Sequence, residues 1–268
     1  MNIKLNGKPF STSCRKMNDL ISEYNPNTKN AVTIINGFQT NNNVEIHEND
    51  EVVIIEKGKM PEKDEFEAML SARHTPKVYE CVKKAKVAVA GLGGLGSNIA
   101  IMLARTGVGQ LHLIDFDVVE PSNLNRQHYF IDDLSLNKTS AVKRQIKRIN
   151  PYIKIICDCV KVDENNCVDL FKNDEIVCEA FDNPDSKALL VNQLLEKTDC
   201  KIVAASGMAG FEKSNTIVTR KISDRFYLCG DGVTEAKQGC GLMAPRVNIC
   251  AAHQANAVLR IILNEFDV

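Results

Sequence analysis

The sequence predicts an α/β protein in two unequal parts, and three observations carry this prediction. An apolar run at 87–90, a cluster of glycines and an apolar segment at 98–106 indicate a buried strand, a tight turn and a helix. A second apolar run at 111–114 ends at Asp115 and completes one strand–helix–strand unit. Ahead of it, residues 1–58 alternate short strand-like runs with turn residues.

The first part, 1–58, is predicted to be a small unit of strands around one helix. Two Asn-Gly dipeptides lie between strand-like runs, and this dipeptide is typical of tight hairpin turns. The dipeptides are Asn6-Gly7 and Asn36-Gly37, the helix is expected at 16–24 and a later strand at 51–55. A charged segment with Pro61 follows, so we place a linker and a helix at 59–78 and the larger domain at 79–268.

The glycines after the first buried strand predict a nucleotide site. Without a Cβ the backbone can approach a phosphate closely, and the start of the next helix presents free N–H groups to an anion. Asp115 follows the second strand, where a carboxylate binds the ribose hydroxyls in Rossmann-like folds. A glycine turn in an ordinary α/β core is the alternative. The glycines are Gly91, Gly93, Gly94 and Gly96.

A polar loop, DFDVVEPSNLNRQ, runs from Asp115 to Gln127. Its arginine suits a nucleotidyl transferase, which must offset the charge of a triphosphate. An NAD(P)-dependent oxidoreductase, the alternative from another class, has no use for such a loop. Together with the turn GLGGLGS, the loop resembles the ThiF/MoeB family, the bacterial relatives of ubiquitin-activating enzymes, over about 70–265.

The resemblance implies a ThiF-type ATP-binding adenylation domain that uses ATP and Mg²⁺. The implied reaction is attack by the C-terminal glycine carboxylate of the sulfur carrier ThiS on the ATP α-phosphate, giving ThiS acyl-adenylate and pyrophosphate for thiazole formation in thiamine biosynthesis. ThiS is expected to act in trans, and the enzyme is expected to be a homodimer. Activation of a molybdopterin-synthase-type carrier is the alternative within the family.

The resemblance also implies roles for individual side chains. Asn123, Arg126 and Lys138 are expected to bind the phosphates. Asp182 is expected to bind Mg²⁺ at the end of a buried strand, with Asn183 beside it at the nucleotide. The alternative for Asp182 is to cap the helix expected to follow it.

Two further residues are candidates through the resemblance. Arg73 is expected to reach the phosphates as a catalytic residue, and a solvated surface arginine is the alternative. Cys240 is a candidate for a covalent link to the carrier, because some ThiF enzymes use such a thiol. Cys240 directly precedes the sequence GLMAP at the start of the last helix, and a helix N-terminus favours the thiolate. The alternative is an inert thiol.

The part at 1–58 resembles the ubiquitin-like β-grasp fold of ThiS. A functional carrier ends in a free Gly-Gly carboxylate, whereas here the chain continues through Glu56-Lys57-Gly58-Lys59. This part therefore lacks the reacting group. It is expected to be a docking or dimer-shaping module, and a fused relic with a structural role is the alternative.

The composition and charge of the chain indicate which binding partners and which cellular compartment are expected. The net charge of −1 over 268 residues argues against a surface held to nucleic acid or membrane by bulk charge. The first residues, MNIKLNGK, contain no apolar signal core, and ten cysteines are expected to stay reduced in the cytoplasm. Many relatives carry two C-x-x-C pairs for a structural zinc. This chain has no such pair, so we predict no zinc.

Overall fold

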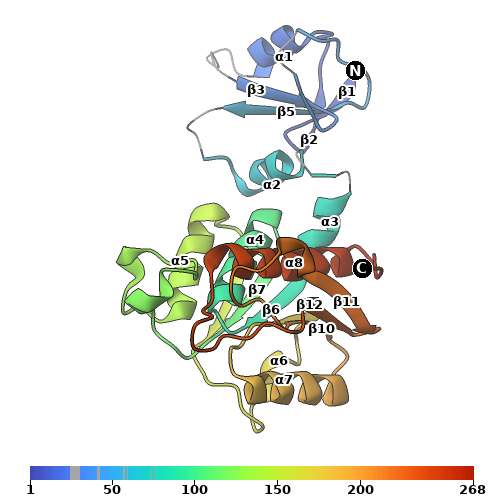
Figure 1. The fold of residues 1–268 in the computed structure, drawn as a ribbon. Helices are drawn as coiled ribbons and strands as arrows, with labels where there is room; N and C mark the ends of the chain where they lie inside the picture. Colours follow the sequence, from blue (N-terminus) through green and yellow to red (C-terminus); the bar gives the residue numbers. More distant parts are fainter. Residues whose placement is uncertain (25–30, 41–42, 57, 59, 73, 76) are drawn as a thin grey trace. The chain divides into compact units, whose positions relative to one another are not determined.

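The computed structural model describes residues 1–24, 31–40, 43–56, 58, 60–72, 74–75 and 77–268. The chain divides into two compact units, 1–80 and 81–268 (Figure 1). No helix within these described ranges is both long and apolar enough to cross a bilayer.

The first unit is a five-stranded sheet in the order β2-β1-β5-β3-β4 with helix α1 against it. Strands β1 and β5 are parallel, and the other neighbours are antiparallel. The buried core lies between the sheet and Met17 and Leu20 of α1. The elements are β1 (Asn2–Leu5), β2 (Lys8–Ser11), α1 (Met17–Tyr24), β3 (Ala31–Ile35), β4 (Phe38–Thr40), β5 (Glu51–Glu56) and α2 (Lys63–Ser71). This architecture confirms the predicted β-grasp fold.

The two predicted hairpin turns of this unit both form. Asn6 and Gly7 have φ angles of 47° and 80°, and Asn36 and Gly37 have 49° and 87°. Positive φ at both central residues matches the right-handed twist of the strands on either side. Asn6 also holds β5, because its side chain donates to the Ile54 carbonyl and accepts the Ile54 N–H.

The second unit is a seven-stranded sheet in the order β11-β12-β10-β9-β6-β7-β8. All its neighbours are parallel except the edge pair β11–β12. The strands are β6 (Lys86–Ala90), β7 (Gln110–Ile114), β8 (Lys154–Asp158), β9 (Ile176–Glu179), β10 (Lys201–Ala205), β11 (Val218–Ser223) and β12 (Phe226–Gly230). The central strands are buried on both faces, as expected from their continuous apolar runs.

Helices cover both faces of this sheet (Figure 1). Helix α4 packs between α5 and α8 on one face, and α6 packs against α7 on the other. The helices are α3 (Val78–Val82), α4 (Gly94–Thr106), α5 (Lys138–Ile149), α6 (Cys167–Phe171), α7 (Pro184–Lys197) and α8 (Ala244–Ile262). Short 3₁₀ turns cover Pro121–Asn123, Ile131–Asp133 and Ser214–Thr216. The predicted Rossmann-like fold is confirmed.

The strand order places a switch point beside β6. The chain proceeds from β6 to β7 and β8 in one direction, and then returns to pair β9 on the opposite side of β6. Ligands of open parallel sheets bind at the carboxyl ends of the strands at such a point. Helix α4 begins here at Gly94, four residues before the predicted start, because the glycine turn itself forms the first helical turn.

A buried histidine links three parts of this unit. The two ring nitrogens of His112, on β7, lie 2.7 Å from Asp174 and 2.7 Å from Asp158. Burial lowers the pKa of His112, but the hydrogen bonds and charges of the two carboxylates outweigh burial and raise it. The charged imidazolium therefore stabilises the folded state. This contribution is complete below the unfolded pKa of about 6.5 and is lost as the pH rises through the higher folded value.

We predict that the free energy of unfolding falls with rising pH above about 6.5 because His112 loses its proton, by at most about 1.4 kcal/mol per pH unit. Substitution His112→Gln should remove this dependence. Urea unfolding at a series of pH values measures it. The control His47→Gln changes an exposed ring in the first unit and should keep the wild-type slope. An unchanged slope in His112→Gln would contradict the assignment.

Candidate functional site

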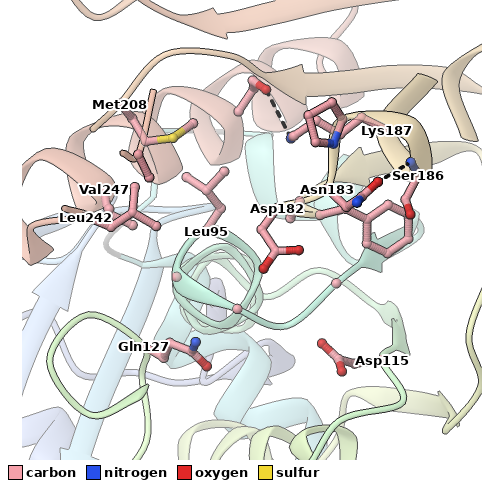
Figure 2. Close-up of a pocket in the computed structure, with 18 of the residues that line it drawn as sticks. Leu95, Asp115, Gln127, Asp182, Asn183, Ser186, Lys187, Met208, Leu242 and Val247 are labelled. Carbon is pink, nitrogen blue, oxygen red and sulfur yellow. Dashed lines mark hydrogen bonds between the residues drawn. The ribbon is translucent and has the colours of Figure 1, made fainter. Parts of the chain in front are cut away.

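A cavity of about 620 Å³ lies at the carboxyl ends of the strands around the switch point (Figure 2). Its volume falls within the roughly 300–1,000 Å³ typical of small-molecule sites. The glycine turn, the residues after β7 and β9, and the loops that lead to α8 line it. The cavity therefore occupies the place where this fold binds its ligands.

Close backbone contacts explain the glycines of the turn. Gly91 has a φ of 89°, and a Cβ there would lie 2.9 Å from the Ala180 carbonyl oxygen. A Cβ on Gly96 would lie 1.8 Å from the Gly91 carbonyl oxygen, so no other residue fits without a backbone shift. Gly93 precedes α4 without a side-chain cap, and it lines the cavity together with Gly94. The first turn of α4 thus directs N–H groups and the positive end of its dipole toward the cavity.

Asp115 joins the turn to the cavity. One carboxylate oxygen accepts the Leu92 N–H at 2.6 Å, and the other accepts the Asp117 N–H at 2.8 Å. Burial raises the pKa of Asp115, although Lys138 and these two hydrogen bonds oppose the shift. Each oxygen keeps a second lone pair, so the carboxylate can accept a ligand hydroxyl while it braces the turn.

Two cations line the same cavity. Lys138 is the first residue of α5, is 6% exposed, and places its Nζ 2.8 Å from the Asp117 carboxylate. Arg126 is half-buried and donates from Nη1 to the Asn125 side chain at 2.9 Å. Both side chains can offset the charge of a bound anion.

Asp182 and Asn183 follow β9 and both line the cavity (Figure 2). The Asn183 side chain accepts the Ser186 N–H at 3.0 Å and caps α7. The alternative that Asp182 caps this helix is therefore wrong. Among the described residues the Asp182 carboxylate has no hydrogen-bond or ion-pair partner, and it is exposed to the cavity, so it remains available to a ligand.

The predicted residues Asn123 and Gly96 do not line the cavity. Asn123 is buried, and its side chain accepts the Glu120 N–H, so it shapes the polar loop. Gly96 lies behind the turn against Gly91. Arg73 falls outside the described residues.

The expected position of Cys240 directly before a helix start is wrong. Helix α8 begins at Ala244, with Pro245 in its first turn, and Cys240 pairs with Lys237 in an isolated bridge. Proline suits the first turn of a helix, so the turn residues ahead of it stay outside α8. Cys240 does not line the cavity described above.

The cavity wall also includes the polar residues Gln127 and Lys187, which were not predicted. Gln127 is 8% exposed, and its Oε1 is buried without a hydrogen-bond partner among the described residues. Lys187 donates to both oxygens of buried Glu179, at 3.1 Å and 2.9 Å, and to the Ala205 carbonyl. Burial raises the pKa of Glu179, opposed by the lysine. The sequence signal that could have identified this pair is a glutamate inside an apolar strand, followed by a lysine eight positions later.

Comparisons with known proteins agree with this geometry. The model of the ThiF family matches residues 68–267, and that of a ThiS-like ubiquitin matches residues 1–58. The Saccharomyces cerevisiae adenylyltransferase and sulfurtransferase UBA4 is 31% identical over 192 residues, 68% of this chain and 42% of the relative. The Salmonella typhimurium molybdopterin-synthase adenylyltransferase is 32% identical over 193 residues, 68% of this chain and 75% of the relative. The chain thus spans about two fifths of the UBA4 relatives.

Solved structures share the fold. E. coli tRNA N6-threonylcarbamoyladenosine dehydratase, TcdA, in complex with ATP, has a TM-score of 0.67 at 21% identity, over 74% of this chain and 93% of that chain. E. coli MccB with ATP has a TM-score of 0.56 at 24% identity, over 75% of this chain and 62% of that chain. At these identities the likeness shows the architecture.

We predict that Gly96→Ala destabilises the protein by about 1–3 kcal/mol or more, because the added methyl meets a carbonyl oxygen. Alanine gains only about 1 kcal/mol in helix propensity, so the clash decides the sign. Urea unfolding measures the change. The control Gly241→Ala adds a methyl with nothing within 4 Å and should be nearly neutral. Equal stabilities of the two variants would refute this account of the turn.

Proposed function

The chain belongs to the ThiF family, and on that premise we propose that it is an ATP-dependent adenylyltransferase that activates a ubiquitin-like sulfur carrier. One observation carries the proposal. A single cavity brings a glycine turn and a helix N-terminus together with the ribose-type acid Asp115, the cations Arg126 and Lys138, and the free carboxylate of Asp182. Hydride transfer to NAD(P) would leave the two cations and Asp182 without a role.

The proposed reaction needs no proton transfer. The C-terminal carboxylate of the carrier is already ionised at neutral pH, since its pKa is about 3.5. One of its oxygens attacks the α-phosphorus of ATP, and the bond from that phosphorus to the oxygen bridging to the β-phosphate breaks. The products are the carrier acyl-adenylate and pyrophosphate. The enzyme therefore acts by alignment and by offsetting charge.

Different lining residues bind the ribose and the phosphates in this proposal. Asp115 accepts the ribose hydroxyls, and the N–H groups at the start of α4 face the phosphates. Arg126 and Lys138 supply positive charge to the triphosphate. In the free enzyme Lys138 is paired with Asp117, so phosphate binding exchanges one anionic partner of the lysine for another, and the half-exposed Asp117 carboxylate is then left to water.

Asp182 fits a magnesium ligand of the usual nucleotide type. Mg²⁺ in such sites keeps several waters and takes one or two carboxylates plus phosphate oxygens, so one free carboxylate suffices. When bound, the ion would neutralise part of the triphosphate charge. Asp182 would hold it, and Asn183 would keep Asp182 in place by capping α7. The absence of zinc and the homodimer stay predictions.

We propose ThiS as the carrier because the chain itself carries a ThiS-like unit at 1–58. A molybdopterin-synthase-type carrier is the second candidate, favoured by the relative from Salmonella typhimurium. Exchange of labelled pyrophosphate into ATP, measured with each purified carrier in turn, tests both. NAD(H) binding without ATP binding in calorimetry would overturn the proposal as a whole.

We predict that exchange requires a carrier with an intact Gly-Gly end. A carrier shortened by its last two residues should give no exchange, because the attacking carboxylate is misplaced. Mass spectrometry should detect adenylate on the carrier and none on this chain, whose ThiS-like unit has no free carboxylate at that point. Adenylation of this chain without any carrier would contradict the assignment in trans.

We predict that Asp182→Asn lowers exchange by about 100-fold or more, because the carboxylate that holds the metal is lost. The melting temperature should not change, since Asn183 provides the helix cap. The matched control Asp185→Asn removes a carboxylate three residues away that does not line the cavity, and it should keep normal exchange. Near-normal exchange by a folded Asp182→Asn variant would remove Asp182 from the site.

A further inference from the structure

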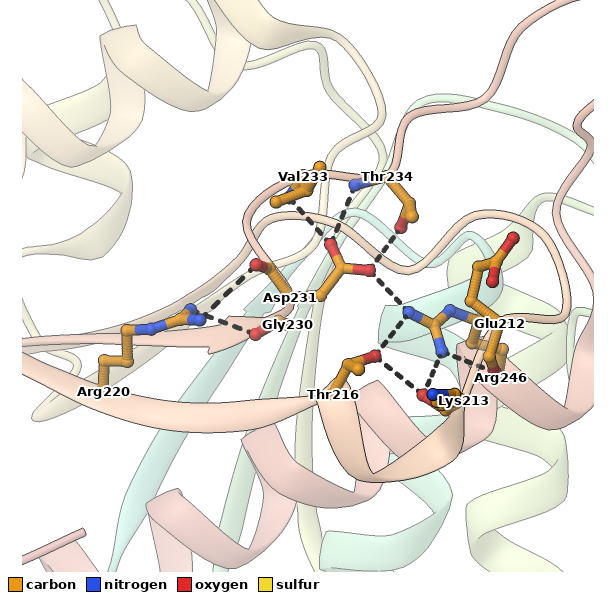
Figure 3. Close-up of polar contacts among 9 residues, drawn as sticks. All are labelled: Glu212, Lys213, Thr216, Arg220, Gly230, Asp231, Val233, Thr234 and Arg246. Carbon is orange, nitrogen blue, oxygen red and sulfur yellow. Dashed lines mark hydrogen bonds and ion pairs between the residues drawn. The ribbon is translucent and has the colours of Figure 1, made fainter.

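A buried ion pair joins the start of α8 to the segment after β12 (Figure 3). Arg246 Nη2, in the first turn of α8, lies 2.5 Å from Oδ2 of Asp231, which follows β12. The two side chains are only 3% and 8% exposed. Neither residue lines the cavity, so any effect on the reaction must pass through the segments that they hold.

The guanidinium of Arg246 fixes the loop between β10 and β11. Its Nη1 donates to the carbonyls of Glu212 and Lys213 at 2.9 Å and 2.8 Å. Its Nη2 also donates to the Thr216 hydroxyl at 3.1 Å. One side chain thus ties the start of α8 to three positions of this loop (Figure 3).

The carboxylate of Asp231 fixes the loop between β12 and α8. One oxygen accepts the N–H groups of Val233 and Thr234, each at 2.8 Å, and the other accepts the Thr234 hydroxyl at 2.8 Å. Burial raises the pKa of Asp231, but these hydrogen bonds and Arg246 outweigh it and lower the pKa to about 2. The carboxylate is therefore charged at neutral pH.

The two loops are also joined backbone to backbone. The Asp231 N–H donates to the Gly207 carbonyl at 2.9 Å, and the Gly232 N–H donates to the Ser206 carbonyl at 2.9 Å. A Cβ on Gly207 would lie 2.0 Å from Asp231 Oδ1, so the contact leaves no room for a side chain. Both loops then line the cavity, through Ser206, Gly207, Met208, Ala209, Thr234, Glu235 and Ala236.

Stability alone does not account for this pair. A buried ion pair recovers little more than its desolvation cost, and well-packed apolar residues often serve as well. Here Arg246 Nε is also buried without a partner among the described residues, which adds to the cost. The two charged groups instead fix the geometry of the loops, because their directional hydrogen bonds hold two irregular segments at one defined position.

The two loops and the start of α8 form one wall of the cavity, and the position of this wall indicates which part of the substrates it contacts. Asp115, Arg126, Lys138 and Asp182 surround the part of the cavity at β6, β7 and β9. The two loops and the start of α8 bound the remaining part. There the small residues Ser206, Gly207, Ala209 and Ala236 alternate with larger side chains such as Met208 and Val247. Small residues let an extended ligand approach the backbone closely. An extended Gly-Gly segment has only backbone groups to recognise.

We propose that Arg246 and Asp231 are positioning residues that set this wall for the C-terminal segment of the carrier, and so control carrier recognition separately from ATP binding. The inference rests on the proposed function. Kinetics of pyrophosphate exchange test it, with the Michaelis constants for carrier and ATP measured separately. Arg246→Met keeps the side-chain length without the charge. It should raise KM for the carrier about 10-fold or more, leave KM for ATP within about 2-fold, and be partly rescued in Arg246→Lys.

Arg220→Met provides a matched control. Arg220 donates to the carbonyls of Gly230 and Asp231, so it contacts the same segment without linking the two loops. Its loss should change KM for the carrier by less than about 3-fold. If Arg246→Met fails to fold, Asp231→Asn and Thr216→Val weaken the same network and should shift the same constant in the same direction.

Two results would overturn the inference. One is an unchanged KM for the carrier in a folded variant. The other is an equal loss for carrier and ATP, which a purely structural role would give. A wild-type chain without exchange for any carrier would instead refute the proposed function itself, and the inference with it. Activity of the wild-type chain is therefore measured first.

Discussion

The close approach of two backbone segments at the switch point is the constraint on which the second unit depends. The turn after β6 touches both the end of β9 and the first turn of α4, at Gly91 and Gly96, with no space for a side chain. Asp115 accepts an N–H from that turn, so the contact extends to β7. Three neighbouring strand ends thereby meet within one cavity, and the helix dipole of α4 is aimed into it.

Much of this arrangement could be predicted because its signals are local. Apolar runs indicate buried strands, Asn-Gly dipeptides indicate hairpins, and the glycine turn indicates a phosphate-binding helix start. The positions of Arg126 and Asp182 on the cavity wall follow from a polar loop and a strand end that parallel pairing brings together. Lys138, at the start of α5, was expected there through the resemblance to the ThiF/MoeB family. The roles of these residues stay predictions.

The rest could not be predicted because it depends on pairs that are distant in sequence. His112 and Asp174 lie 62 positions apart, and neither stands out locally. Arg246 and Asp231 are closer, but their loops have no regular pattern to place them. The cap of α7 depends on a one-residue shift between Asp182 and Asn183, and the start of α8 depends on where Pro245 falls in its first turn.

The strand order has a consequence for biosynthesis. Strand β9 pairs with β6 only after the residues between Val87 and Ile176 have been made, and α8, which lines the cavity through Val247, comes last. Long-range parallel pairing forms slowly, because loop-closure entropy is lost before the contacts are gained. A growing chain on the ribosome therefore holds an incomplete site, and the side of α4 that faces α8 stays uncovered until α8 emerges and packs against it. The cavity can therefore be completed only when nearly the whole unit has been synthesised.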